Sequence, residues 1–318
     1  MERLSQEQNK TKALEVKSVF SVDVEDGVSI AMRDIFNKTV PQTDRVIRTT
    51  EVILDLLAKH HTKATFFTLA QVAEAFPALV QRIVSEGHEL AVHGNKHLLF
   101  SQMTPQLARQ ELSSAKKKLE DISGQYVIGH RAPAFSISER TPWAIDVLLE
   151  CGFQYDSSIM PIKASRYGWP GFSENPCLLI GNDNRKLVEV PIKPIKLFGK
   201  AFPYSGGSYL RLLPYSLIKT GFSQNPTQSI LYIHPYELDT KQYPDYYLAA
   251  LKKESLWTQL KMRSMWFNRK NTIHKLDDLL SCFRFDTMKN FIKATEQQKT
   301  LKKINFRELV ARGKNSTL

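Results

Sequence analysis

The sequence contains few cysteines and no long hydrophobic run. Its 318 residues include only 3 cysteines, scattered at Cys151, Cys177 and Cys282 and odd in number. This pattern excludes the disulfide framework of a small secreted domain and indicates a reducing compartment. No segment reaches the ~18 uninterrupted apolar residues of a membrane-spanning helix, and residues 1–17 contain no apolar run of signal-peptide length. We therefore expect a cytoplasmic protein.

Acidic residues are scarce relative to basic ones. The 32 Asp and Glu against 44 Lys and Arg leave a formal net charge of +12, and the excess lies late in the chain, at 193–200, 252–270 and 299–314. The positive potential of these basic residues suits an anionic membrane surface or an anionic substrate. The alternative is a solvated basic face without a partner. No zinc finger, basic zipper or RNA-recognition motif is present. We expect peripheral contact with an anionic membrane at its inner face, and no nucleic acid.

Segments typical of strands and of helices alternate between residues 16 and 158. Apolar, β-branched runs at 16–24, 63–69 and 89–92 predict buried strands. Between them, apolar residues recur at helical spacing, as after Pro77, which suits the first turn of a helix. This alternation is typical of parallel βα units, and a chain of this length can form one large α/β domain with an appendage, or two domains.

Polar side chains follow the predicted strands, at the point where each strand ends. They are Asp23, Glu25, Asp26, His93, His97, Arg131, Asp156, Glu189 and His234. Because active sites of parallel barrels are built where the strands end, we expect these side chains to meet at one rim. Two histidines and a carboxylate can hold a divalent cation. With a second carboxylate as base and another histidine as acid, the set suits hydrolysis of an amide or ester.

Five motifs, in order along residues 16–240, resemble those of the polysaccharide deacetylases of carbohydrate esterase family 4. They are Ser21-Val-Asp23-Val-Glu25-Asp26 in place of Thr-Phe-Asp-Asp, His93-Gly-Asn-Lys-His97, Arg131-Ala-Pro133, Asp156-Ser157-Ser158 and Leu231-Tyr-Ile-His234. The chain is most similar to a subgroup with an Asp-Val-Glu-Asp first motif, which accompanies exopolysaccharide or capsule biosynthesis. The resemblance implies a metal-dependent N-deacetylase with a distorted (β/α) barrel.

By this resemblance, His93 and His97 bind one divalent cation, which we expect to be Zn²⁺, with Co²⁺, Fe²⁺ or Ni²⁺ as alternatives. The first motif departs from the family because its acids are spread over three positions. Strand alternation places Asp23 and Glu25 on the same side, which favours Glu25 as the carboxylate ligand. If the strand ends at Val24, Asp26 is free to turn inward and match the second Asp of the family's usual pair, and both alternatives stay open.

The resemblance also implies catalytic roles. Asp23 would be the general base, with Arg131 orienting its carboxylate. His234 would be the general acid, tuned by Glu189. The backbone N–H of Ala134, directly after the motif proline, would bind the oxyanion. The alternative for Asp23 and Arg131 is a purely structural ion pair.

Asp156, Ser157, Tyr209 and Arg211 are candidate substrate-binding residues. The first two belong to the Asp-Ser-Ser motif, and the other two follow a pair of glycines in a loop that can approach a ligand closely. For all four, bracing of loops is the alternative.

We divide the chain into a polar segment at 1–15, a deacetylase-like barrel at 16–240 and a basic helical extension at 241–318. The extension is expected to pack on the barrel, with an interfacial membrane element as the alternative. The resemblance implies removal of N-acetyl groups from an N-acetylhexosamine-containing glycan or lipid-linked precursor in exopolysaccharide, capsule or cell-envelope biosynthesis. The alternatives are an amidase acting on a small non-sugar amide, oxygen activation at an iron site, and a non-catalytic glycan- or membrane-binding scaffold.

Overall fold

The computed structural model describes residues 17–164, 167–181, 184–197 and 199–306. The N-terminal segment predicted at 1–15 lies outside these residues, as does the end of the predicted extension after residue 306. Among the described helices, none combines the length and the apolar character needed to cross a membrane.

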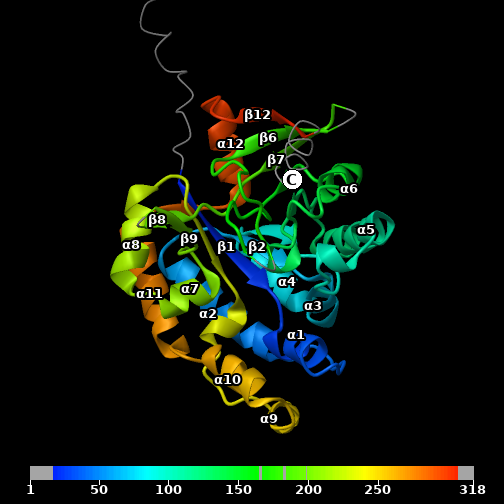
Figure 1. Cartoon of the computed structure of the whole chain (residues 1–318), viewed down its shortest axis with the longest axis vertical. Coiled ribbons are helices and arrows are strands. Elements are labelled where there is room, and N and C mark those ends of the chain that lie inside the picture. Colours follow the sequence, from blue (N-terminus) through cyan, green and yellow to red (C-terminus); the bar gives the residue numbers. More distant parts are fainter. Residues whose placement is uncertain (1–16, 165–166, 182–183, 198, 307–318) are drawn as a thin grey trace, which may run out of the picture.

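Strand β1, Ser18–Val24, lies at the centre of the fold and is buried along its whole length (Figure 1). Because side chains alternate across a strand, β1 has two different faces. Val22 and Val24 pack in a hydrophobic core beneath the surrounding helices. Val19 packs in a second core on the other face, inside the curved sheet, and alternation places Asp23 on this inner face too.

Ten strands form one sheet in the order β10-β1-β2-β3-β4-β5-β7-β6-β12, with β11 also beside β1. All of these pairs are parallel except β6 with β7. The remaining strands of this sheet are β2 Thr65–Thr68, β3 Glu89–Val92, β4 Gly129–His130, β5 Tyr155–Asp156, β6 Cys177–Ile180, β7 Lys186–Glu189, β10 Ile230–Ile233, β11 Phe285–Asp286 and β12 Lys302–Asn305. A separate antiparallel pair consists of β8 Ile195–Leu197 and β9 Lys200–Phe202. The sheet is barrel-like, and within the described residues no pairing joins β10 to β12. The predicted α/β class is confirmed.

Helices surround this sheet and follow its strands in the chain (Figure 1). The α-helices are α1 Gly27–Asp34, α2 Arg45–Lys59, α3 Ala70–Ala75, α4 Pro77–Ser85, α5 Pro105–Ser123, α6 Ala144–Glu150, α7 Gly207–Leu212, α8 Tyr215–Gln224, α9 Asp245–Leu251, α10 Leu256–Ser264, α11 Arg269–Cys282 and α12 Met288–Gln297. Three 3₁₀ turns are η1 Phe100–Gln102, η2 Pro133–Phe135 and η3 Pro235–Leu238. The predicted helix start at Pro77 is confirmed, since this proline occupies the first turn of α4.

The interior of the sheet is filled by large side chains, among them Phe67, Tyr155 and Tyr232. Gly129 in β4 makes room for one of them, because a Cβ atom at this position would lie 2.0 Å from Cζ of Tyr155. The interior is therefore a packed core, and the inward side chains beyond the strand ends lie on top of it.

The region after residue 240 is not only helical, as the sequence predicts, because two short strands in it join the main sheet. Strand β11 pairs with β1, and β12 pairs with β6. Strand β12 has the sequence Lys-Lys-Ile-Asn and is largely exposed, so it carries none of the apolar alternation that reveals a strand. The boundary at residue 240 stays a prediction.

Candidate metal centre and active site

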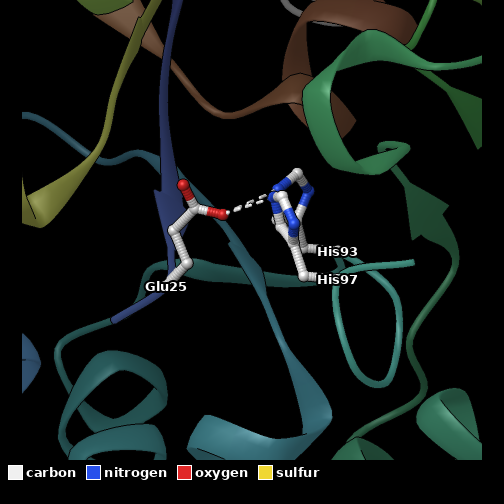
Figure 2. Close-up of side chains that lie close together, drawn as sticks. All are labelled: Glu25, His93 and His97. Atoms are coloured by element: carbon white, nitrogen blue, oxygen red, sulfur yellow. Dashed lines mark ion pairs between the residues drawn. The ribbon is translucent and has the colours of Figure 1, made fainter. Parts of the chain in front are cut away.

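Three side chains from the ends of β1 and β3, the two strands on either side of β2, converge on one point. Glu25 follows β1, and His93 and His97 follow β3. Oε2 of Glu25 lies 3.0 Å from Nε2 of His97 and 3.5 Å from Nε2 of His93. One ligand atom from each residue lies within 4.8 Å of the other two, and Figure 2 shows the carboxylate facing both imidazoles. The structure thus brings the first acidic cluster and the histidine pair together.

The turn after β3 positions the two histidines. Gly94 has a φ of 92° and His97 a φ of 58°, and both values lie in the left-handed region. Glycine adopts this region readily, whereas a histidine is strained there, and such strain is concentrated at functional sites. The two imidazole rings end with their centroids 5.8 Å apart. The four-residue spacing therefore joins the imidazoles through a turn rather than along a helix.

The donor set fits a divalent cation. Oε2 of Glu25 is buried and accepts no hydrogen bond, although both Nε2 atoms face it. Nδ1 of His93 donates to the Arg131 carbonyl oxygen at 3.0 Å, which leaves its Nε2 lone pair available to a metal. Burial raises the pKa of Glu25, but His97 and His93 outweigh burial and hold this pKa well below its usual value. An ionised carboxylate with two imidazoles is a ligand set that Zn²⁺ accepts.

Asp26 lies outside this cluster. Its Oδ1 accepts a hydrogen bond from the N–H of Val28 at 3.0 Å and caps helix α1. Its Oδ2 accepts from the backbone N–H of Thr43 at 2.6 Å. The chain remains extended at Asp26, with φ −90° and ψ 103°, so strand alternation continues past β1 and turns Asp26 away from the interior. Of the two predicted carboxylate ligands, the structure places Glu25 with the histidines, and this geometry favours Glu25 over Asp26.

Asp23 and Arg131 form a buried ion pair beside the cluster. Oδ1 of Asp23 accepts from Nη1 of Arg131 at 2.8 Å, and the arginine is 0% exposed. The same guanidinium donates to Oγ of Ser21 at 2.9 Å and to the carbonyl oxygen of Ser157 at 3.1 Å. Its face also covers the Phe67 ring, with 4.1 Å from Cζ to the ring centroid. Arg131 therefore holds one oxygen of Asp23 and leaves Oδ2 directed toward the site.

His234 lies across the site from the two metal-binding histidines. Its Nε2 is 3.8 Å from Oδ2 of Asp23 and 3.7 Å from Oε1 of Glu25. Its Nδ1 donates to Oε1 of Glu237 at 2.6 Å, and its ring stacks on Tyr236 with a centroid distance of 4.9 Å. Burial lowers the pKa of His234, but the hydrogen bond to Glu237 and the neighbouring carboxylates outweigh it and raise this pKa to about 9. Near neutral pH His234 therefore carries a proton that it can donate through Nε2.

Glu237, rather than Glu189, is the carboxylate that contacts His234. Glu189 is 0% exposed, and its Oε1 accepts from the N–H of Ile159 at 3.0 Å. Burial and the nearby Asp156 raise the pKa of Glu189 well above its usual value. The hydrogen bond of His234 therefore gives Glu237 the position predicted for Glu189, and a tuning role of Glu189 stays a prediction. The signal for Glu237 was present in the sequence, three positions after His234 and beyond a proline that starts turn η3.

Asp156 and Ser157 brace the site from within instead of lining it. Both are 0% exposed. Asp156 pairs with Nδ1 of His130 at 2.7 Å and accepts from Oγ of Ser158 at 2.7 Å. Oγ of Ser158 in turn accepts from the N–H of Ala132 at 2.8 Å, which anchors the segment that follows Arg131. This burial favours the alternative in which Asp156 and Ser157 brace loops, and their contact with substrate stays a prediction.

For Arg211 the structure also favours the alternative of a brace over contact with substrate. Arg211 is 2% exposed, and its Nη1 donates to the carbonyl oxygens of Ser264 and Phe267, both at 2.7 Å. It thereby ties helix α7 to the end of α10. Tyr209 in α7 is only half-buried, and its hydroxyl lies 3.2 Å from that of Tyr167. Of the four predicted substrate-binding residues, Tyr209 alone has appreciable exposed surface.

Ala134 lies in a strained turn directly after Pro133. It has φ 51° and ψ 29°, and Phe135 also has a positive φ of 52°. Two consecutive non-glycine residues in the left-handed region are costly, and they persist here because the loop is anchored on both sides. The Phe135 ring packs against Arg131, with 5.6 Å from the guanidinium carbon to the ring centroid. The role of the Ala134 N–H as oxyanion donor stays a prediction.

Two family models match adjacent parts of the chain. Residues 42–155 match the model described as polysaccharide deacetylase, and residues 157–293 match a domain of unknown function, DUF3473. The first match contains the histidine pair and Arg131, and the second contains His234 and Glu237. The residues that converge in space therefore come from both matched segments and from β1, which precedes them.

Known proteins are similar to parts of the chain. It is 32% identical over 108 residues to the peptidoglycan deacetylase of Helicobacter pylori, and 34% identical over 98 residues to the peptidoglycan-N-acetylglucosamine deacetylase of Bacillus cereus. These matches cover 34% and 30% of this chain and only 36% of the length of each relative. A crystal structure from Mycobacterium smegmatis, assigned to the polysaccharide deacetylases, aligns over 91% of this chain and 93% of its own with a TM-score of 0.61. At 19% identity this likeness concerns the fold alone.

Proposed function

We propose that the chain, in which residues 42–155 match the polysaccharide deacetylase model and residues 157–293 match the DUF3473 domain, is a metal-dependent hydrolase that removes N-acetyl groups from a glycan. One observation carries the proposal: Asp23 and His234 adjoin the cluster of Glu25, His93 and His97. Nε2 of His234 lies 3.8 Å from Oδ2 of Asp23, within reach of one small reacting group between them. A base, an acid and a cation site at one point are what amide hydrolysis requires.

Glu25, His93 and His97 would hold the cation, with Zn²⁺ as first choice and Co²⁺, Fe²⁺ or Ni²⁺ as alternatives. When bound there, the cation supplies Lewis acidity, which polarises the amide carbonyl and lowers the pKa of water. Support for metal dependence comes from the buried carboxylate oxygen of Glu25, which faces two imidazole nitrogens without accepting a hydrogen bond.

The proton transfers follow from the positions of the side chains. Oδ2 of Asp23, the oxygen not held by Arg131, accepts a proton from the attacking water. The backbone N–H of Ala134 donates a hydrogen bond to the oxyanion of the tetrahedral intermediate. Nε2 of His234 gives its proton to the amide nitrogen as the C–N bond breaks, which releases acetate and the free amine of the sugar. Glu237 keeps the Nδ1 proton in place and stabilises the imidazolium before transfer.

The proposed substrate is an N-acetylhexosamine-containing glycan or lipid-linked precursor of exopolysaccharide, capsule or cell envelope, processed in the cytoplasm at the inner face of the membrane. Two relatives support a sugar substrate by their names, peptidoglycan deacetylase and peptidoglycan-N-acetylglucosamine deacetylase. The net charge of +12 supports an anionic form of it, such as a phosphate-linked precursor. Among the residues predicted to bind substrate, we retain Tyr209 as a contact.

Acetate release tests the proposed activity. We expect the purified protein, supplied with Zn²⁺, to release acetate from an N-acetylglucosamine oligosaccharide or a lipid-linked N-acetylhexosamine. Asp23→Asn keeps the size of the side chain but removes the base, so the rate should fall by about 10²–10⁴-fold with metal content unchanged. Asp121→Asn, in an exposed pair with Lys117, serves as the matched control. Acetate release that is undiminished in Asp23→Asn, or absent from all these substrates, contradicts the proposal.

Glu237→Gln tests how His234 is held as an acid. Glutamine can still accept the Nδ1–H hydrogen bond but removes the negative charge, so the pKa of His234 should fall from about 9 by about one unit. Since His234 acts in its protonated form, activity is lost as pH rises through this pKa, and the alkaline limb of the pH–kcat profile should move to lower pH. NMR titration of the imidazole measures the same shift without substrate. The exposed Glu150→Gln is the control, and an alkaline limb that stays in place in Glu237→Gln shows that Glu237 has no such role.

A further inference from the structure

Helix α10 presents an apolar face to solvent. Leu256 is 78% exposed, Trp257 77% and Leu260 61%, and Phe267 just beyond the helix is 66% exposed. Half of the ten large hydrophobic residues exposed on the described part of the chain lie between Tyr246 and Phe267. Single exposed apolar residues are ordinary, but a contiguous group marks an interaction surface. We call Leu256, Trp257, Leu260 and Phe267 the α10 face.

The helix is attached to the barrel by its opposite side. Met262 is 2% exposed and packs in a core with Val28 and Met32 of α1 and Tyr247 of α9. At 100° per residue, Leu256, Trp257 and Leu260 fall within about 100° of one another and well away from Met262. The outward apolar residues are therefore not needed for the packing of α10 on the barrel.

Basic residues surround the α10 face. The exposed ones are Lys252, Lys253, Lys261, Arg263 and Lys270. On the helix, Lys261 and Arg263 flank the apolar residues on either side. Between residues 246 and 270 the sequence contains a single acid, Glu254. The surface is thus apolar at its centre and positive at its rim.

We propose that the α10 face binds peripherally to an anionic lipid bilayer, with Trp257 and the leucines in the headgroup region and the lysines on lipid phosphates. A helix lying in the plane of the interface combines these two features. The positive charge favours an anionic bilayer over a second copy of the chain, because two copies docked through this face would bring their basic rims together. Because Met262 of α10 stays packed in the core against α1 and α9, only the outer side of the helix is available to the bilayer.

The position of α10 relates this surface to the active site. Helices α9 and α10 pack on α1, which begins one residue after Asp26 and two after Glu25, and all three lie at the lower end of the molecule in Figure 1. Strand β1 runs into α1 at this same end. A bilayer on the α10 face would therefore lie near the rim that carries the candidate metal centre. This deepens the proposed function by naming the membrane partner, and lipid binding itself requires no activity.

Vesicle binding tests the inference. We expect the full chain to co-sediment with vesicles of phosphatidylglycerol and phosphatidylcholine in low salt, and to bind pure phosphatidylcholine more weakly. The triple variant Leu256→Ser, Trp257→Ser, Leu260→Ser should bind at least about tenfold more weakly, and Lys252→Gln with Lys253→Gln should lose about fivefold per charge. Tyr126→Ser, at an exposed aromatic remote in sequence from α10 and 94% exposed, is the control and should bind as wild type. Acetate release from a water-soluble oligosaccharide should be unchanged in the triple variant.

Three outcomes overturn the inference. The wild-type protein does not bind anionic vesicles, or a folded triple variant binds them as well as wild type does. The third outcome is that the wild-type protein is a dimer and the triple variant is a monomer that still binds lipid. If the triple variant fails to fold, the single Trp257→Ser replaces it, with tryptophan emission as the measurement. Wild type should show a blue shift on vesicles that this variant lacks, and an equal shift in both contradicts the inference. His93→Ala, which lacks a proposed metal ligand, should still bind anionic vesicles. This variant therefore tests membrane binding independently of the proposed activity.

Discussion

Replacing Glu25 with glutamine is expected to abolish binding of the divalent cation and to reduce deacetylase activity by at least about 10³-fold. The neutral amide keeps the shape of the side chain but loses the charge that pairs with the cation, while His93 and His97 remain in place. Metal content after dialysis and the rate of acetate release from an N-acetylglucosamine oligosaccharide measure the two losses.

Asp26→Asn is the matched control for this variant. Both acids follow β1, but Asp26 caps helix α1, and asparagine is also a good N-cap. We expect Asp26→Asn to retain metal and most of the activity. If the metal ion is lost in Asp26→Asn and kept in Glu25→Gln, Asp26 is the carboxylate that coordinates the cation, and the proposed cluster of Glu25, His93 and His97 is not the metal site.

Arg131→Met is expected to destabilise the protein by about 3–5 kcal/mol. The arginine is 0% exposed and contacts Asp23, Ser21 and Ser157, so its removal leaves a buried carboxylate without a partner. Urea unfolding measures the loss as a lower midpoint at unchanged slope. The double variant with Asp23→Asn should recover part of the stability, because the uncompensated charge is then removed as well.

Arg109→Met provides the comparison for Arg131. This arginine pairs with Glu150 on the surface, where the two side chains are 46% and 36% exposed. Exposed pairs contribute little, so we expect a change within about 1 kcal/mol. A similar shift of the urea midpoint in Arg131→Met and Arg109→Met would mean that the Asp23–Arg131 pair contributes no more to the free energy of unfolding than an exposed ion pair does.

Strand alternation explains which of the predicted residues meet. Asp23 and Glu25 share the inward side of β1 and its continuation, and the residues after β3, β4 and β10 that face the same interior are His93, Arg131 and His234. The sequence predicts which side chains face the interior, because the apolar residues of a strand show how its side chains alternate between the two faces. In β1, Val22 and Val24 lie on one face, so Asp23 lies on the other.

The same alternation explains why Asp156 does not line the site. In β5, Tyr155 belongs to the interior core, so its neighbour Asp156 points outward and joins His130 and Glu189 instead of the site. Strands β4 and β5 contain two residues each, too few for alternation to be read before the structure is known.

The sequence by itself determined the α/β class, the order of the motifs and the residue types able to bind a cation, because hydrophobic periodicity and ligand chemistry are local properties. Only the tertiary structure decided that Glu25 rather than Asp26 faces the histidines, that Glu237 holds His234, and that Asp156 and Arg211 are braces. Each of these depends on which way a side chain leaves a strand or turn and what it meets across the fold. Contacts over more than a hundred residues, such as Asp23 with Arg131, are set by the packing of the whole sheet and not by any neighbour in the sequence.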